Sequence, residues 1–210
     1  MAAEPRSIVI FDLGGVLVDW DPRHLYRQLF PGDEAGMEQF LAGVCTNEWN
    51  LQQDAGRSWA EATALLRAQH PGQEALIDAF HQRWPEMIRG AIDGTVEILR
   101  ELREAGVPLY ALTNWSAETF PVAEERFDFM GWFRGVVVSG REKLIKPDPR
   151  IYRLLLERFG VDPRQAVYID DNPANAQAAT GLGMQGIHFT SPEHLRAALV
   201  TLGLPVKPLA

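Results

Sequence analysis

Four short stretches of the sequence carry side chains that could act together on one substrate. Each follows a short apolar run, and the first, IVIFDLGGVLVDW at residues 8–20, holds one aspartate and then two glycines. Carboxylate, hydroxyl, amide and ammonium groups gathered at one place can supply a nucleophile, hydrogen-bond donors and a cation site. The residues are Asp12, then Thr113, Asn114, Trp115 and Ser116, then Lys143 and Lys146, and then Asp170, Asp171 and Asn172.

Each of these residues has a structural explanation when it is taken alone. Asp12 could cap a turn, and Asp170 or Asp171 could cap the helix that follows. Thr113 could bond a loop amide, and Lys146, which precedes a proline, could be a solvated loop residue. The recurrence of four functional types at the ends of four successive apolar runs favours a common site instead.

The apolar runs predict buried strands of a parallel sheet. They are short, rich in aliphatic and β-branched residues, and apolar on both faces. Parallel strands end at the same edge of a sheet, which is where open α/β sheets bind their ligands. We therefore expect the four stretches to meet there. The predicted strands are residues 7–12, 107–113, 135–139, 166–170 and 185–190.

Helices are expected between these strands from residue 95 onward. They cover residues 95–105, 149–159, 173–183 and 191–202. Glycines at 106 and 160 supply helix stops, and prolines at 149 and 173 suit a first helical turn. Strand and helix thus alternate, which predicts an α/β fold with a doubly wound, Rossmann-like parallel sheet.

Residues 21–90 interrupt that alternation. Helices are expected after Asp21–Pro22, near residues 33–45, from the capping box that begins at Ser58, and near 73–89 with an interruption at Pro85. We find no strand-like alternation in the segment. The stretch around 49–57 is less regular and could face the active site, where Asp54 and Arg57 could touch a substrate's hydroxyls or could pair with each other at the end of a helix. We therefore expect a catalytic core of residues 1–18 and 91–210, with an all-helical cap domain of residues 19–90 inserted into it.

The stretches FDLGGVL, LTN, KPDPRIY and YIDDN occur in this order. They resemble the four motifs of the haloacid dehalogenase-like hydrolase superfamily. The resemblance covers nearly the whole chain, including a helical cap (type C1) directly after the first motif. DLGGVLVDWD, with glycine two places after the aspartate, is most similar to a subgroup of bacterial sugar-phosphate phosphatases.

The resemblance implies a role for each motif. Asp12 would be the nucleophile that forms an aspartyl-phosphate intermediate. Thr113 and Asn114, with Trp115 beside them, would bind the phosphoryl group. Lys146 would neutralise charge on the attacking carboxylate and on the phosphoryl group. The expected substrate is a small phosphorylated metabolite such as a sugar phosphate.

The resemblance also implies a Mg²⁺ cofactor. Asp12, the backbone carbonyl of Gly14 and Asp171 would hold the ion, with Asp170 beside them. A hard cation prefers such oxygen ligands. Lys143 is the weaker lysine candidate, because only Lys146 directly precedes the Pro-Asp-Pro of the third motif.

One acid of the family pattern is missing. Most phosphatases of this family carry a second aspartate two residues after the nucleophile, and here that place is Gly14. General acid–base help is worth about 10²–10⁴-fold, or about 3–5 kcal/mol of barrier. The substrate could have a good leaving group, such as an anomeric phosphate, or a cap residue could lend an acid, or a metal-bound water could serve instead. Asp19, Asp21 and His24 are closest in sequence, although a helix cap suits Asp21 and a surface position suits His24.

Two other functions stay open. A 2-haloacid dehalogenase uses the same aspartyl nucleophile without metal, and halide leaves without a proton. Asn114 with Trp115, and an arginine at 23, 27 or 57, could then hold halide and carboxylate. Against this, the pair Asp170 and Asp171 would repel an anionic substrate without a cation. The third possibility is a catalytically weak relative that binds a ligand without turnover.

Composition limits the class of protein. The 210 residues are 46% hydrophobic and 23% charged, with a net charge of −8. Without a block of Lys or Arg, we expect no nucleic-acid or membrane partner. The single cysteine, Cys45, allows no disulfide within the chain and no thiolate metal cluster. We expect a reduced, cytoplasmic enzyme that is a monomer or homodimer.

Overall fold

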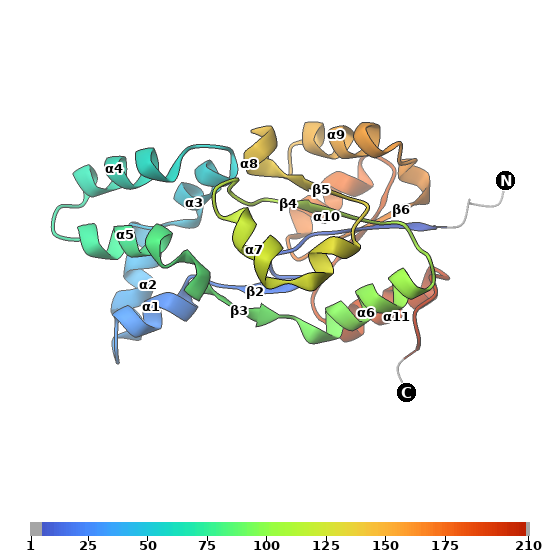
Figure 1. The fold of residues 1–210 in the computed structure, drawn as a ribbon, viewed down its shortest axis with the longest axis horizontal. Helices are drawn as coiled ribbons and strands as arrows, with labels where there is room; N and C mark the ends of the chain where they lie inside the picture. Colours follow the sequence, from blue (N-terminus) through green and yellow to red (C-terminus); the bar gives the residue numbers. More distant parts are fainter. Residues whose placement is uncertain (1–5, 209–210) are drawn as a thin grey trace.

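The core of the molecule is a parallel five-stranded sheet, with strands in the order β5–β4–β1–β6–β7. The computed structural model describes residues 6–208. Figure 1 shows the sheet with helices on either side, which confirms the predicted α/β fold. All the predicted strands are present. Their bounds are β1 (Ile8–Phe11), β4 (Leu109–Thr113), β5 (Gly135–Val138), β6 (Ala166–Asp170) and β7 (Gln185–His188).

Helices cover both faces of the sheet because successive strand residues point to opposite sides. Val9 and Phe11 belong to one apolar cluster with α6 and α11, while Ile10 belongs to another with α9. The four predicted helices are confirmed, although α10 ends three residues early. They are α6 (Asp93–Glu104), α9 (Pro149–Phe159), α10 (Pro173–Thr180) and α11 (Pro192–Thr201). Shorter elements are α7 (Phe120–Arg126), α8 (Ser139–Glu142), η2 (Asp128–Trp132) and η3 (Pro163–Gln165).

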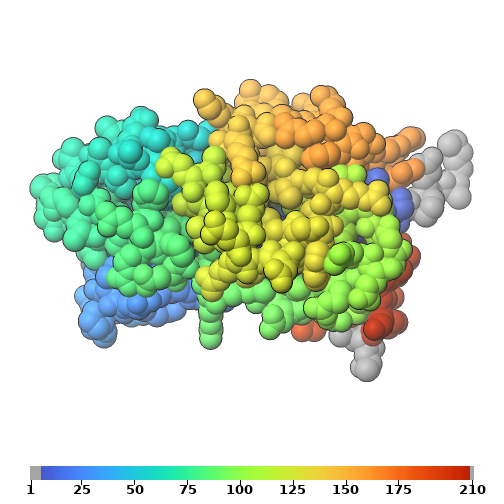
Figure 2. All heavy atoms as spheres, in the orientation of Figure 1, coloured from blue at the N-terminus to red at the C-terminus, as the bar shows by residue number. Residues whose placement is uncertain are grey.

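A helical segment lies to one side of the sheet (Figure 1). In the space-filling view, its atoms, coloured blue to green, abut the part of the core coloured yellow (Figure 2). Ser58 caps α4 as predicted, since its hydroxyl accepts a hydrogen bond from the Glu61 amide at 3.2 Å. That residues 19–90 form a separate domain stays a prediction. The helices are α1 (Arg23–Leu29), α2 (Glu34–Gly43), α3 (Asn47–Asp54), α4 (Trp59–Gln69) and α5 (Glu74–Gln82).

Two expectations for this segment were wrong. A short antiparallel pair, β2 (Val18–Trp20) and β3 (Ile88–Ala91), joins it to the core, and β3 begins within residues 21–90, where no strand was expected. The stretch around 49–57 was expected to be irregular, yet Thr46 caps a regular helix, α3, by accepting a bond from the Trp49 amide. The interruption expected at Pro85 is present: α5 ends at Gln82, and Pro85 lies in a 3₁₀ turn, η1 (Trp84–Met87).

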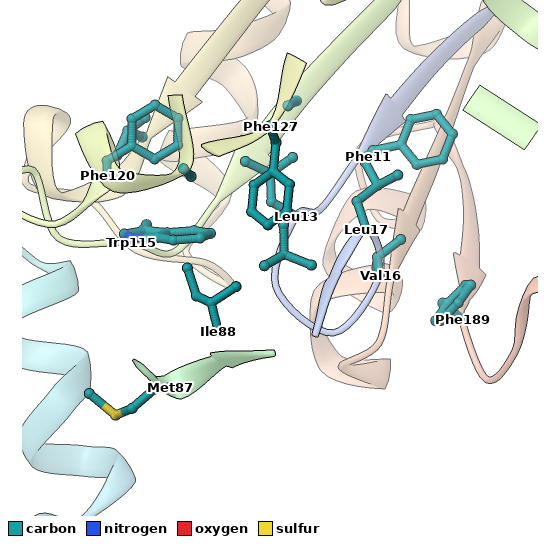
Figure 3. Packing of buried hydrophobic residues seen from close by; sticks show 14 of the residues in the cluster. Phe11, Leu13, Val16, Leu17, Met87, Ile88, Trp115, Phe120, Phe127 and Phe189 are labelled. Atoms are coloured by element: carbon teal, nitrogen blue, oxygen red, sulfur yellow. The ribbon is translucent and has the colours of Figure 1, made fainter. Parts of the chain in front are cut away.

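The turn after β1 is anchored in the apolar core. Leu13, Val16 and Leu17 are fully buried, and Figure 3 shows them beside Phe11 and near Phe127. The amides of Leu17 and Val18 both donate to the carbonyl of Leu13 at 2.8 Å. Buried apolar side chains and backbone hydrogen bonds therefore fix the position of this turn and of its polar residues. In the described part of the chain, no helix has the length and apolar character needed to cross a membrane.

Candidate active site

Asp12 stands at the carboxyl end of β1, the central strand. Its amide donates to the carbonyl of Ile169 on β6 at 2.8 Å, and its Oδ1 accepts from the Leu13 amide at 2.7 Å. Phe11 is in register with Ala111 of β4 and with Ile169. The residues that end β4 and β6 therefore lie at the same edge as Asp12, which is where the strand order reverses direction.

Lys146 connects the two buried carboxylates of this edge. Its Nζ lies 2.8 Å from Oδ2 of Asp12 and 2.7 Å from Oδ2 of Asp170, and the side chain is 1% exposed. Asn114 holds the backbone of this lysine with two hydrogen bonds. The Lys146 amide donates to Asn114 Oδ1 at 2.8 Å, and Asn114 Nδ2 donates to the Lys146 carbonyl at 3.1 Å. The third motif is thereby fixed to the second.

Asp170 is fully engaged by neighbouring groups of the protein. Besides Lys146, its Oδ2 accepts from the Tyr168 hydroxyl at 2.6 Å. Its Oδ1 accepts from the Asn172 amide at 2.9 Å and from Asn175 Nδ2 at 3.0 Å. These bonds satisfy both oxygens of a carboxylate that is 0% exposed, so Asp170 is well placed to orient Lys146.

Asp171, by contrast, is exposed and lies against the glycine turn. Gly15 has φ +71°, and a Cβ there would overlap the Asp171 carboxylate. A Cβ at Gly14 would meet nothing within 4 Å. Oxygens of Asp12, Asp170 and Asp171 lie within 4.8 Å of one another. The sequence therefore needs glycine at 15 for conformation and for the approach of Asp171, while position 14 has free space.

The charges of this cluster do not balance. Burial raises the pKa of Asp12, Lys146 opposes this, and the charges of Asp170 and Asp171 add to it. Burial and the charge of Asp170 also raise the pKa of Asp171. Three carboxylates beside one ammonium leave two negative charges uncompensated when all are ionised. A divalent cation with oxygen preference fits this donor set, because it would offset that charge.

A small cavity of about 60 Å³ lies between the strand ends and the helical segment. Two features of its wall matter for chemistry. It has room beside Gly14, and it includes a buried carboxyl, Asp54 at the end of α3, whose pKa burial raises to about 7. A larger cleft of about 420 Å³ within the helical segment shares Trp20 and Asn50 with it. The small cavity is lined by Gly14, Trp20, Asn50, Asp54, Trp84, Asn114 and Trp115.

The structure brings the predicted site residues together at one edge of the sheet. Thr113 and Trp115 are buried there with the residues described above. Lys143 is not part of the cluster. It is exposed, and a Cβ at Gly56 would lie 3.0 Å from Lys143 Cγ, so it packs beside the turn after α3.

Sequence reasoning missed two residues that hold Asp170. Tyr168 precedes it by two positions on the same strand, so both side chains point to the same face of the sheet. Asn175 lies on the first turn of α10. The strand period could have indicated Tyr168, whereas nothing in the spacing indicated Asn175.

The acids expected from the helical segment lie elsewhere. His24 Nε2 lies 3.0 Å from Asp19 Oδ1, and Asp21 Oδ1 accepts from the Arg23 amide at 2.8 Å at the start of α1. None of these three residues lines the small cavity. The Asp54 carboxyl does.

A family model described as haloacid dehalogenase-like hydrolase matches residues 7–183. The matched region contains every residue of the cluster at the strand ends. The chain belongs to the haloacid dehalogenase-like hydrolases. This hydrolase is 30% identical over 188 residues to pyrophosphatase PpaX of Bacillus velezensis, with 88% of this chain and 84% of that protein covered. It is 28% identical over 219 residues to acyl-CoA dehydrogenase family member 10 of Mus musculus, covering 94% of this chain and 19% of that protein, so it spans about a fifth of that relative.

Solved structures of related proteins have the same architecture. One is a haloacid dehalogenase family enzyme from Bacteroides thetaiotaomicron in complex with magnesium and inorganic phosphate, with a TM-score of 0.66 at 26% identity. It covers 88% of this hydrolase and 94% of that chain. Another is the L-2-haloacid dehalogenase RSc1362, with a TM-score of 0.63 at 25% identity over 86% of this hydrolase and 85% of that chain.

Proposed function

We propose that this hydrolase is a Mg²⁺-dependent phosphatase that acts on a small phosphorylated metabolite through an aspartyl-phosphate on Asp12. The observation that supports this best is the buried chain of contacts from Asp12 through Lys146 to Asp170, with Asp171 beside it. The relative named a pyrophosphatase, and the related structure that holds magnesium and phosphate, agree with this chemistry.

The roles of the chain's own residues follow from their positions. A carboxylate oxygen of Asp12 attacks phosphorus, and the bond from phosphorus to the leaving oxygen breaks. Lys146 offsets the negative charge that the attacking carboxylate and the phosphoryl oxygens share. Thr113, Asn114 and Trp115 bind the phosphoryl group and its surroundings. Because Asn114 already holds the Lys146 backbone through both atoms of its amide, its larger contribution is to position that lysine.

Magnesium would be held by the carboxylates of Asp12 and Asp171 and by the Gly14 carbonyl, with Asp170 behind them. When bound, such an ion polarises phosphoryl oxygens and neutralises developing charge. Asp171 is the better ligand of the acid pair. The oxygens of Asp170 are taken by Lys146, Tyr168, Asn172 and Asn175, while Asp171 is an exposed residue at the edge of the cluster.

Dehalogenation is the second candidate, since a related structure is a haloacid dehalogenase. A haloacid needs a cation for its carboxylate, and the candidates were arginines 23, 27 and 57. Arg23 pairs with Glu38, and Arg27 pairs with Glu34. Arg57 donates to Gln53. Among the described residues, no arginine lines the small cavity, and Asp54 does. This wall suits a phosphate ester better than a haloacid.

One assay separates the three functions. The purified protein is incubated with a panel of phosphorylated metabolites, including sugar phosphates, with Mg²⁺ and with EDTA. Chloroacetate and 2-chloropropionate are run beside them. Phosphate release that EDTA abolishes supports the proposal, and halide release that resists EDTA supports the dehalogenase. Ligand binding without either product indicates a relative without turnover.

A further inference from the structure

We infer that Asp54 is the general acid and base of this hydrolase. It lies on the wall of the cavity opposite Gly14 and replaces the acid that is absent at position 14. The inference deepens the proposed phosphatase function and rests on it. Its structural basis is one small cavity that has Gly14 on the strand side and Asp54 on the helical side.

A carboxyl on either of these two walls could exchange a proton with a leaving group held between them. In this protein the carboxyl is on the helical wall. A Cβ at Gly14 would meet nothing within 4 Å, so the space that an acid at position 14 would use is open. At about 60 Å³ the cavity is small, which keeps a leaving oxygen bound there close to its lining groups. Asp54 is the carboxyl among those lining groups.

The Asp54 side chain is held in place by its neighbours. Its residue is 7% exposed, and its Oδ2 accepts from Asn50 Nδ2 at 3.3 Å. A backbone hydrogen bond from Ser116, directly after the second motif, reaches it from the core. The turn that follows α3 lies against α8, since a Cβ at Gly56 would stand 3.2 Å from the Gly140 carbonyl. The carboxyl is therefore a fixed part of the wall.

The surroundings favour a carboxyl that exchanges its proton near neutral pH. Burial raises its pKa to about 7, against the Ser116 bond and the charge of Lys146, which both lower it. The end of a helix, where carbonyl groups are exposed, also disfavours a negative charge. The charged residues of the adjoining α8, Arg141 and Glu142, pair with Glu124 and Arg158. The charge that acts on Asp54 from the core is therefore that of Lys146, which lowers the pKa of Asp54.

The proton balance closes over the two steps. When Asp12 attacks phosphorus, the electron pair of the breaking bond goes to the leaving oxygen, which takes the proton of Asp54. In the second step Asp54, now a carboxylate, accepts a proton from the water that attacks phosphorus. The bond from phosphorus to Asp12 breaks, its electron pair returns to the carboxylate, and inorganic phosphate leaves. Asp54 is protonated again for the next turnover.

The test compares Asp54→Asn with the wild type on two probes in the presence of Mg²⁺. Phenyl phosphate needs a proton on its leaving oxygen, and 2,4-dinitrophenyl phosphate does not. We expect single-turnover phenol formation to fall about 10²–10⁴-fold. The first turnover of the dinitrophenyl ester should stay near the wild-type rate and appear as a burst, because hydrolysis of the intermediate is then slow.

The pH dependence of the reaction is a second readout. In the wild type, kcat/KM for phenyl phosphate should fall above about pH 7, and this fall should vanish in the Asp54→Asn variant.

Two further variants complete the design. Gly14→Asp in the Asp54→Asn background should restore much of the phenyl phosphate turnover, since position 14 has room for the side chain. Asp19→Asn changes a carboxylate that is 39% exposed and paired with His24, and should leave both probes unaffected. Equal losses on both probes with no burst, or an unchanged rate in a folded Asp54→Asn, would overturn this inference while the phosphatase stands. A wild type that hydrolyses neither probe overturns both.

Discussion

The Nζ of Lys146 lies 2.8 Å from Oδ2 of Asp12, and both side chains are buried. This contact places the positive charge of the lysine beside the carboxylate that would attack phosphorus. Asp170 holds the ammonium group of Lys146 through a second ion pair, and Asn114 holds the Lys146 backbone through two hydrogen bonds. The lysine thus has a structural role in the cluster and, under the proposed function, a catalytic one, and separate experiments can distinguish them.

Replacing this lysine should destabilise the fold. Lys146→Met leaves two buried carboxylates without their partner, and breaking a buried ion pair in this way costs about 3–5 kcal/mol. The measurement is the free energy of unfolding from urea denaturation. Lys143→Met is the matched control, because that lysine is exposed and away from the carboxylates, and its effect should stay within about 0.5 kcal/mol. Equal stabilities of the two variants would contradict the structural role.

The two glycines after Asp12 should respond differently to alanine. Gly15→Ala forces a left-handed residue to carry a Cβ, which costs about 1–2 kcal/mol, and pushes on Asp171. Gly14→Ala meets no atom within 4 Å and should leave stability nearly unchanged. Thermal unfolding and Mg²⁺-dependent activity of both variants check this. If Gly15→Ala were tolerated as well as Gly14→Ala, the close approach of Asp171 would not matter.

Asp171 should govern the metal requirement. Asp171→Asn removes one of the three clustered carboxylates, so the Mg²⁺ concentration for half-maximal phosphate release should rise about tenfold or more. Asp162→Asn serves as control, since Asp162 pairs with Arg164 in the turn before β6. A variant at position 171 with an unaltered Mg²⁺ dependence would exclude this residue as a ligand.

Burial of Asp54 predicts a pH-dependent change in stability that needs no activity assay. Its pKa is raised from 3.8 to about 7 in the folded state, so the proton binds more tightly there than in the unfolded chain. The stability this confers is complete below about pH 4 and is lost as the pH rises through about 7. The amide that replaces the carboxyl in Asp54→Asn does not titrate. The stability of this variant relative to wild type should therefore increase from about pH 4 to about pH 8, and a constant difference would show that Asp54 is not desolvated.

The sequence was sufficient to predict the sheet and the residues at its edge. Short runs that are apolar on both faces mark buried strands, and parallel strands end at the same edge, so Asp12, Thr113 and Asp170 could be placed from the pattern alone. Lys146 could be separated from Lys143 by the Pro-Asp-Pro that follows it, and the structure places only Lys146 beside Asp12.

The helical segment was harder to predict for physical reasons. The inward face of α3 includes Asn50, Gln53 and Asp54, so the helix has no apolar stripe to reveal it. Strands β2 and β3 have three and four residues, and their partners are far apart in sequence. Alternation over so few residues gives no usable signal. The sequence indicated Asp54 only as a residue that could touch a substrate, and the cavity is what suggests a role for it as an acid.

The most direct test of the account is to trap the intermediate on Asp12. The wild type is mixed with 2,4-dinitrophenyl phosphate and Mg²⁺, quenched in acid within one turnover, and digested for mass spectrometry. We expect one phosphoryl group on the Asp12 carboxylate, absent with EDTA and absent in Asp12→Asn, which should also lose about a thousandfold or more in turnover. Rapid phosphate release by Asp12→Asn, or wild-type turnover with the group on another residue, would contradict the account.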